Sequence, residues 1–520
     1  CIEREQFMST DKTPVVVGVG QYTQPVPEDL SQCLSFADIG ARAAALAMED
    51  CGPAVAGSID VIAAVRTFED SLPGTAPFGR TTNLAGSVAT RLGLKPSRTV
   101  YEVLGGQSPQ KLVGEFSAAL HRGECDAVLL LGAEVIASIR ALKNAAKNGF
   151  AAPHWDEQPA FECEDRGPGL DSTLINQEDM RHGLMQPMQF YALMENARRG
   201  AVGLSRQEYR QQMGELFAPF TRVAAQNPHA FFRRQYSAAE ITGTSAANPM
   251  LVEPYCRNLV SKDGVNQAAA LVLTTVGKAR ELRIDEDRWV YLHAYSDTRE
   301  SHLLEREQLG ASAAMQTAID HCMRQADKKT ADIAHFDIYS CFPVVVFNAA
   351  DYLGLAYTGQ QLTQTGGLPY FGGPGNNYSM HGLVSLAETL RNDQGAFGFL
   401  LANGGWMSKC SVGIYSTTPV TDWSPVSSDA LAAVVNARNR VEVSTRPDDD
   451  AVIETCAVTY EQGQPARCHV VARLAGHGRR CLAVSHDAGI ARQFVTDDFE
   501  PLGRTVRVSH DPAGNRFRLG

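Results

Sequence analysis

The sequence lacks the features that mark several common protein classes. Its longest apolar run, 127–132, is followed closely by Glu134 and is far shorter than the roughly 18 residues that a membrane-spanning helix needs. No glycine loop ends in Gly-Lys-Ser or Gly-Lys-Thr, and no GxSxG occurs, which excludes phosphate-loop and serine nucleophile-elbow mechanisms. Residues 1–8 carry charges without an apolar core, so we expect no secretion signal there.

Positive charge is also in short supply. The 520 residues include 47 Lys and Arg against 58 Asp and Glu, which gives a formal net charge of −11. Binding to nucleic acid or to an anionic membrane depends on a basic surface. We therefore expect neither partner.

The 12 cysteines form no CxxC pair. In a chain of this size, scattered cysteines are more often reduced core residues than a disulfide framework, so we expect a cytoplasmic protein. The histidines and cysteines crowded near the end of the chain match no zinc spacing, and alternating strands would point them to opposite faces. We predict no metal site among Cys468, His469, His477, Cys481 and His486.

Length and composition predict a folded chain of about three or four domain-sized units, at about 150 residues per domain. The content of 44% hydrophobic and 20% charged residues is typical of folded proteins. Continuous apolar strands such as Ala127–Leu131 follow amphipathic helices such as the one expected over Ser108–His121. This alternation is typical of an α/β protein with a largely parallel sheet.

The strand and helix order occurs twice, as an internal duplication visible in element order but not in residue identity. We predict a first half over 13–138, an inserted helical lobe over 139–256, completion of the first half over 257–284, a second half over 285–422 and a tail over 426–520. The short, closely spaced, glycine-punctuated strands of the tail are typical of a small all-β barrel or sandwich.

Glycine is enriched at the expected strand ends. The chain has 45 glycines, against about 36 at average usage. Backbone N–H groups at such turns, beyond the carboxyl ends of strands, bind anions or polarised carbonyls. The cluster at Gly18–Thr23 does not predict a dinucleotide site, because Thr23 replaces the third glycine that close helix packing requires. The other clusters lie at Leu104–Gln110, Thr365–Gly382 and Ala402–Trp406.

Five motifs, in order, resemble those of the thiolases, and especially the sterol-carrier-type thiolases. VYEVLGGQSPQ stands where thiolases carry the nucleophilic Cys, NQAAALVLTT resembles the segment that closes the first half, and FDIYSCFP stands where relatives have NEAF or HDCF. TGGLPYFGGPG resembles the GHPxG loop, and ANGGW with KCSVGIY resembles the final CxGGGxG segment. The resemblance covers 13–418 and implies an α/β thiolase fold of two similar βαβαβαββ halves with an inserted loop domain. The small all-β tail, which we expect to be oligonucleotide-binding-like, is additional.

The same alignment removes the catalytic side chains of a thiolase. Gly105 stands at the nucleophile position, Gly373 at the histidine position, and Ala402 (or Leu401 with a shifted gap) at the acid/base cysteine position. Tyr339 replaces the Asn or His of the third motif. Thiolysis needs a thiolate, a base that activates it and a second thiol, so we do not expect standard thiolase activity.

Backbone chemistry and polar neighbours remain as candidates. The N–H groups of Gly105 and Gly404 could form an oxyanion hole for a thioester enolate. We consider Tyr339, Tyr378 and His381 for proton transfer, with packing as the alternative for His381 and space filling as the alternative for Tyr339; we assign Cys341 a packing role. The oxyanion and acyl-CoA set implied by the resemblance is Gly105, Gly106, Gly372, Gly373, Asn376, Asn403, Gly404 and Gly405.

The resemblance implies CoA or acyl-CoA as the ligand and no covalently bound cofactor. One hypothesis is an acyltransferase or lyase with non-covalent C–C bond chemistry, including a retro-aldolase-like lyase on a β-hydroxyacyl-CoA. The alternatives are a non-catalytic acyl-CoA-binding or regulatory protein, and a partner that completes a complex with another thiolase-type protein. Thiolase relatives are commonly dimers, so a homodimer is expected unless the tail blocks that surface. By analogy of architecture, the tail is a candidate cover for the acyl-CoA tunnel.

Overall fold

The computed structural model describes residues 11–71, 74, 76–170 and 173–519. The segment 1–8, for which we expected no secretion signal, lies outside this part. Across the described residues, no helix has the length and apolar character to cross a bilayer.

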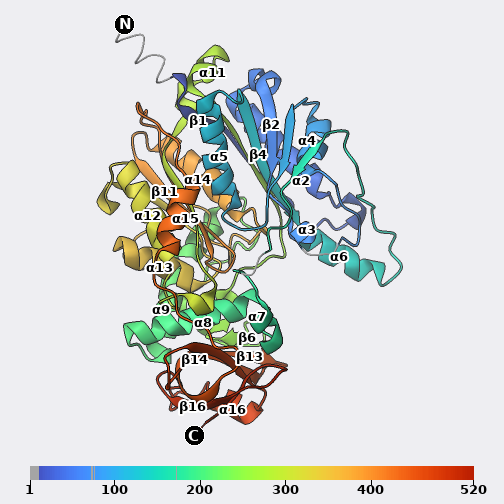
Figure 1. Ribbon diagram of the computed structural model, residues 1–520. Helices are drawn as coiled ribbons and strands as arrows, with labels where there is room; N and C mark the ends of the chain where they lie inside the picture. Colours follow the sequence, from blue (N-terminus) through green and yellow to red (C-terminus); the bar gives the residue numbers. More distant parts are fainter. Residues whose placement is uncertain (1–10, 72–73, 75, 171–172, 520) are drawn as a thin grey trace.

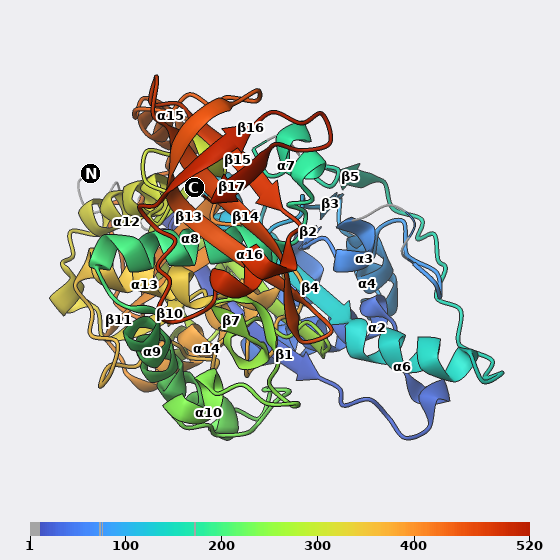
Figure 2. The ribbon, with the colours of Figure 1, turned by 90° about the horizontal axis from the view of Figure 1, so that it is seen from below.

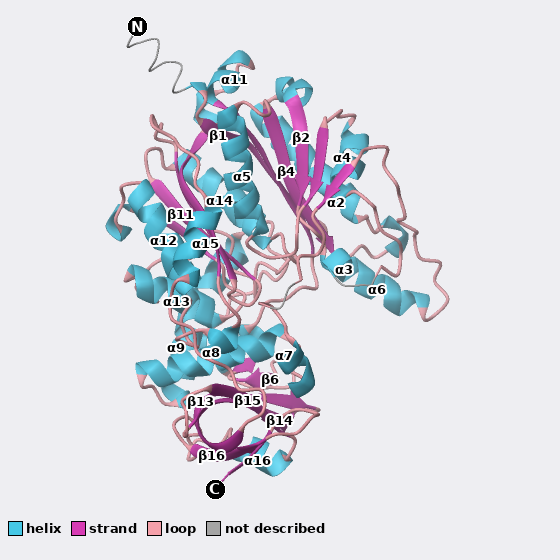
Figure 3. Ribbon diagram, in the orientation of Figure 1, coloured by secondary structure: helices cyan, strands magenta, loops and turns pink. Residues whose placement is uncertain are grey.

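Ten strands form one mixed sheet in the larger part of the molecule (Figure 3). Two halves of this sheet meet where β1 and β9 pair in antiparallel fashion. In spatial order, the strands are β10 (His335–Ile338), β11 (Phe397–Gly404), β12 (Lys409–Ser416), β9 (Val290–Arg299), β1 (Pro14–Thr23), β8 (Asn266–Thr275), β4 (Ala127–Val135), β2 (Ile59–Ala64), β3 (Arg98–Tyr101) and β5 (Cys163–Asp165).

The two halves repeat one topology. In the first, β2 is parallel to β4, β4 is antiparallel to β8, and β8 is antiparallel to β1. In the second, β10, β11, β12 and β9 repeat these orientations in the same order. The prediction of two similar α/β halves is therefore confirmed, although both belong to one continuous sheet.

Two helices lie between the halves, α5 (Ser108–Arg122) and α14 (Tyr378–Asn392), as Figure 1 shows. Their apolar residues share one core with β strands from both halves. The first half is covered on its other face by α2 (Phe36–Cys51) and α4 (Leu84–Leu92). The second half is covered by α12 (Ala313–Gln325) and α13 (Pro343–Leu353). The short helices α3 (Phe68–Ser71) and α11 (Val276–Glu281) lie in connections.

Local sequence fixes the ends of these helices. Ser35 and Asp38 form a capping box at the start of α2, and Gly52 ends that helix before Pro53. Gly123 ends α5 in the left-handed conformation, which glycine adopts without steric cost. The helix expected over Ser108–His121 accordingly agrees to within one residue with α5.

The inserted segment is not purely helical. It contains α6 (Ile136–Ala146), α7 (Gln177–His182), α8 (Pro187–Val202), α9 (Arg206–Gln226) and α10 (Ala238–Thr242). It also contributes β5, which pairs with β3 at the edge of the large sheet, and β6 (Met250–Glu253) with β7 (Tyr255–Cys256), which extend the second sheet. The expectation of a helical lobe was incomplete because these strands are only two to four residues long and carry no clear alternation.

The C-terminal region forms a closed barrel, as the sequence predicted. Its strands pair in a ring because β13 bonds to β14 as well as to β16. The helices α15 (Ser428–Asn436) and α16 (Ala488–Gln493) flank it. The ring consists of β13 (Asp448–Glu461), β14 (Gln464–Leu474), β15 (Arg480–Ser485), β17 (Arg516–Leu519) and β16 (Thr505–Ser509).

The barrel packs against the inserted segment (Figures 1 and 2). On α8, Asn196 Nδ2 donates to Cys456 O at 3.0 Å, and Leu193 O accepts from Thr455 Oγ1 at 2.5 Å. Arg199 adds a bidentate ion pair with Glu500 at 2.8 Å. Since β6 also pairs with β13, the barrel and the inserted segment share a sheet.

A buried carboxylate ties α8 to the second half. Glu195 accepts hydrogen bonds from Tyr209 Oη at 2.5 Å, Tyr255 Oη at 2.7 Å and the Val344 N–H at 2.7 Å. Val344 lies at the start of α13, where a negative charge is favoured by the helix dipole. Burial nevertheless outweighs these donors and raises the pKa of Glu195 to about 7.

We expect Glu195 to make stability pH-dependent. Its pKa is raised from 4.5 to about 7 in the folded state, so the folded protein binds more protons and loses stability as pH rises between these values. The loss is on the order of 3 kcal/mol. In Glu195→Gln, urea unfolding should show a flatter pH profile between pH 5 and 8. Parallel profiles for the two proteins would contradict this assignment.

Candidate active site

Four segments distant in sequence meet beyond the strand ends. They are the turn at 105–107 before α5, the end of β10 at Tyr339, the loop 366–377 before α14, and the end of β11 at Asn403. The Gly105 N–H donates to Asn376 Oδ1 at 2.9 Å, and Ser379 Oγ donates to Gly106 O at 2.6 Å. The glycine loops that resemble the thiolase motifs are thus brought together.

The space beside Gly105 is occupied. Its φ of +145° lies in a region that L side chains rarely adopt, and a Cβ there would be 2.1 Å from Gln107 Oε1. Gln107 is 2% exposed, and its Oε1 has no hydrogen-bond partner within the described chain. A cysteine at this position would need both a strained backbone and a displaced Gln107.

Gly373 and Ala402, the other two positions that the sequence resemblance predicts to be catalytic in thiolases, also have close neighbours. A Cβ on Gly373 would be 2.1 Å from Ser261 Oγ, and the Gly373 N–H already donates to Lys262 O at 2.8 Å. Ala402 is fully buried in β11, opposite Ser411 of β12. Neither side chain can take or deliver a proton.

Two tyrosines lie next to this closed position. A Cβ on Gly106 would be 2.3 Å from Tyr339 Oη, so the phenol of Tyr339 faces the turn directly. Its ring packs edge-on against that of Tyr378 with centroids 5.4 Å apart. Burial raises the pKa of both phenols above the ordinary value of 10, and they are neutral hydrogen-bond donors at physiological pH.

Tyr339 and Tyr378 differ in their partners. Tyr378 Oη lies 2.6 Å from Thr365 Oγ1. Within the described residues, the neighbours found for Tyr339 are Tyr378, whose ring packs against it, and Cys341, and no hydrogen bond of its Oη is among them. The Tyr339 phenol is therefore the group available to a ligand beside Gly106.

His381 has its contacts elsewhere. Its Nδ1 lies 2.8 Å from Gln21 Oε1 of β1, and its ring packs against Phe371 with centroids 5.1 Å apart. Burial lowers the pKa of His381 well below 6.5, so the imidazole is neutral. These contacts favour the packing alternative, and the role of His381 in proton transfer stays a prediction without support from its position.

The backbone N–H groups expected to form an oxyanion hole differ in whether they already have a hydrogen-bond partner. The Gly105 N–H is already used by Asn376, whose Nδ2 in turn donates to Arg66 O at 2.8 Å. Gly404 lies against the turn, since a Cβ on it would be 2.9 Å from the Gly106 nitrogen. Gly372 and Gly405 have positive φ and line the same loops.

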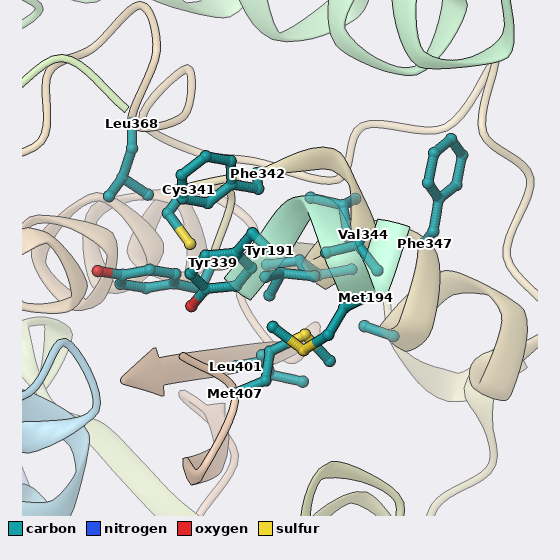
Figure 4. Close-up of a cluster of buried hydrophobic side chains, with 14 of the residues drawn as sticks. Tyr191, Met194, Tyr339, Cys341, Phe342, Val344, Phe347, Leu368, Leu401 and Met407 are labelled. Atoms are coloured by element: carbon teal, nitrogen blue, oxygen red, sulfur yellow. The ribbon is translucent and has the colours of Figure 1, made fainter. Parts of the chain in front are cut away.

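Tyr191 is a site residue that the sequence did not predict. It reaches the centre from α8 of the inserted segment, where Asn403 Nδ2 donates to its Oη at 2.9 Å. In Figure 4, the sulfur of Cys341 points toward the rings of Tyr191 and Tyr339. Burial raises the pKa of Cys341 to about 12, so this thiol is protonated and inert as a nucleophile. No motif marks Tyr191, because the inserted segment has no regular pattern.

A cavity of about 580 Å³ lies away from this centre, between α8, α13, the segment 307–311 and the barrel. Two arginines on its walls already have partners: Arg198 bonds to Asp351 at 2.9 Å, and Arg480 bonds to Glu454 at 2.6 Å. The positive charge of both arginines is thus already balanced by neighbouring carboxylates.

The fold and the arrangement of the four loops define a thiolase-like protein with an added C-terminal barrel. The family model for the "thiolase-like protein type 1 additional C-terminal domain" matches residues 430–513. A crystal structure of a monomeric SCP2-thiolase like protein type 1 from Mycobacterium smegmatis is 37% identical, with a TM-score of 0.83, and the match covers 98% of this chain and 99% of that one. The chain belongs to the SCP2-thiolase-like protein type 1 family.

Two more distant structures share the fold alone. The Ltp2–ChsH2(DUF35) aldolase is 15% identical, with a TM-score of 0.56, over 78% of this chain and 98% of that one. Human mitochondrial 3-ketoacyl-CoA thiolase is 14% identical, with a TM-score of 0.55, over 79% of this chain and 100% of that one. The comparison with curated proteins gives no match.

Proposed function

We propose that this protein binds the acyl end of a CoA thioester non-covalently and carries out no thiolytic acyl transfer. The observation that carries this proposal is the filled space at Gly105, where Gln107 Oε1 stands 2.1 Å from the position of any added Cβ. Without a nucleophile, an acyl group cannot move onto the protein. The likeness to a 3-ketoacyl-CoA thiolase supports a CoA thioester as the ligand.

Tyr339 supplies the polar contact in this proposal. As a neutral phenol without a protein partner, it can donate a hydrogen bond to the thioester carbonyl beside Gly106. The N–H groups of Gly106 and Gly404 are the remaining proposed donors.

The second candidate is a retro-aldolase-like lyase acting on a β-hydroxyacyl-CoA. The observation that favours it is the contact between Tyr339 and Tyr378 beside the same turn. The fold likeness to an aldolase that includes a DUF35 component is compatible with this candidate. Binding of the thioester is common to both candidates and is tested first.

Binding should depend on the Tyr339 hydroxyl. In isothermal titration with acetyl-CoA, we expect Tyr339→Phe to weaken binding by about two- to tenfold, the equivalent of one hydrogen bond of about 0.5–1.5 kcal/mol. Tyr352→Phe is the matched control, because Tyr352 is exposed on α13 and bonds to Asp320. Mass spectrometry after incubation should show no covalent acyl adduct. Absence of acetyl-CoA binding, or an acylated protein, would disprove the proposed function.

A further inference from the structure

A chain of buried hydroxyl groups connects Tyr378 to a carboxylate. Tyr378 Oη lies 2.6 Å from Thr365 Oγ1, which lies 3.2 Å from Thr363 Oγ1. Thr363 Oγ1 donates to Asp337 Oδ2 at 3.2 Å. Each of these four side chains is at most 1% exposed. The path therefore runs inside the protein, from the centre to the end of β10.

Backbone N–H groups orient the hydroxyl groups of this hydrogen-bonded series. The Gly366 N–H donates to Thr363 Oγ1 at 3.0 Å, and the Gly367 N–H donates to Thr365 Oγ1 at 3.2 Å. Both glycines have positive φ, +112° and +81°, and so turn their N–H groups onto the threonines. With a lone pair of each hydroxyl occupied in this way, its own proton is free to point along the chain toward Asp337.

Asp337 is held as an acceptor. The N–H of Gln364 donates to its Oδ2 at 2.8 Å, and that of Thr365 approaches at 3.4 Å. Across the described residues, it forms no ion pair with Lys, Arg or His. Asp337 is faced by Thr363 and Thr365 from the loop before α14, and by Gly382 from α14 itself. The titratable group linked to it by the two threonines is Tyr378.

The pKa of Asp337 allows its carboxylate to accept a proton and release it again near neutral pH. Burial raises its pKa to about 6, against the opposing effect of its three hydrogen-bond donors. The carboxylate is mostly ionised at neutral pH and can accept one proton. Tyr378, whose pKa is raised by burial, passes a proton on while it receives another and never has to carry a negative charge.

We infer that Asp337, through Thr363 and Thr365, takes and returns the proton that Tyr378 exchanges with a bound β-hydroxyacyl CoA thioester. The inference rests on the proposed binding of a CoA thioester. In it, Tyr378 is a catalytic residue, and Asp337 and the two threonines are positioning residues that act through it.

The step balances without an oxidant or a second substrate. The β-hydroxyl gives its proton to Tyr378 Oη, and the Tyr378 proton moves through both threonines to Asp337. The Cα–Cβ bond then breaks, so that Cβ becomes an aldehyde or ketone carbonyl and the electron pair stays on Cα as the thioester enolate. Tyr339 donates a hydrogen bond to the enolate oxygen. The stored proton returns through Tyr378 to Cα and leaves an acyl thioester.

Two reactions of the whole protein test the relay. One is cleavage of 3-hydroxybutyryl-CoA to acetyl-CoA and acetaldehyde; the other is deuterium uptake at Cα of acetyl-CoA in D₂O, which needs no β-substituent. We expect Thr365→Val, Asp337→Asn and Tyr378→Phe each to slow both by about 100-fold or more, the usual contribution of general acid–base catalysis. Thr365→Ser keeps the hydroxyl and should restore the rate to within about fivefold.

Measuring acetyl-CoA binding distinguishes a failure of the proton relay from a failure of the proposed function. Acetyl-CoA affinity, measured by isothermal titration, should change less than about threefold in Thr365→Val and Asp337→Asn. In the wild type, the rates of both reactions should rise with pH near 6, and Asp337→Asn should abolish this rise. Wild-type protein that binds acetyl-CoA but supports neither reaction overturns the relay and leaves the binding proposal intact. Equal rates in Thr365→Val and Thr365→Ser also overturn it. A wild-type protein that binds no acetyl-CoA overturns both.

Discussion

Gly105→Cys is expected to destabilise the protein by about 2–4 kcal/mol and to yield no acyl-transfer activity. The backbone φ of +145° is unfavourable for any side chain, and the added Cβ would stand 2.1 Å from Gln107 Oε1. Gln107 is itself buried, so its side chain would have to repack within the interior to make room. Urea unfolding measures the first effect, and mass spectrometry after incubation with acetyl-CoA measures the second.

A second glycine separates backbone strain from crowding. Gly123 also has positive φ, +73°, but a Cβ on it would meet nothing within 4 Å. Gly123→Cys should therefore cost only about 1 kcal/mol. Adding Gln107→Ala to Gly105→Cys should recover the part of the loss that arises from crowding. A Gly105→Cys protein as stable as the wild type, or one that becomes acylated, would show that the nucleophile position is open after all.

The parts of the fold that were predictable from sequence are those with local causes. The apolar run at Ala127–Leu131 and the capping box at Ser35 each determine one element without help from distant residues. The repeated element order predicted the duplication. By contrast, β5 and β6 exist because each pairs with a strand far away in the sequence, β3 and β13. Strands this short have too little pattern of their own to be recognised.

The candidate site shows the same division. The glycine loops and Tyr339 could be found because they stand at strand ends in an ordered set of motifs. Gln107 was overlooked as the residue that fills the nucleophile space, since filling depends on how a flexible side chain folds back on the turn. The hydroxyl relay from Tyr378 to Asp337 involves residues up to 41 positions apart, and only their convergence gives them a shared chemistry. Tyr191 comes from a different segment altogether.

Arg480→Met is expected to remove about 2–4 kcal/mol from the docking of the barrel, because it leaves two buried backbone carbonyls, Leu304 O and Arg306 O, without their donor. Arg480 is 1% exposed. Its Nη1 donates to Leu304 O at 2.8 Å and to Arg306 O at 2.6 Å, while its Nε donates to Glu454 Oε2 at 2.6 Å. The bonds to Leu304 and Arg306 join β15 of the barrel to the segment that follows β9, whereas the bond to Glu454 of β13 lies within the barrel.

The neighbouring Arg479 gives a matched control. It pairs with Glu442 at 2.9 Å, but both side chains are at least half exposed, and such surface pairs contribute about 0–1 kcal/mol. Because the barrel has an apolar core of its own, Arg480→Met should loosen docking before the barrel itself unfolds. Calorimetry should then resolve an early transition in Arg480→Met that is absent in Arg479→Met. A single, equally shifted transition in both variants would mean that the barrel is held by its apolar contact with α8 and by β6, rather than by Arg480.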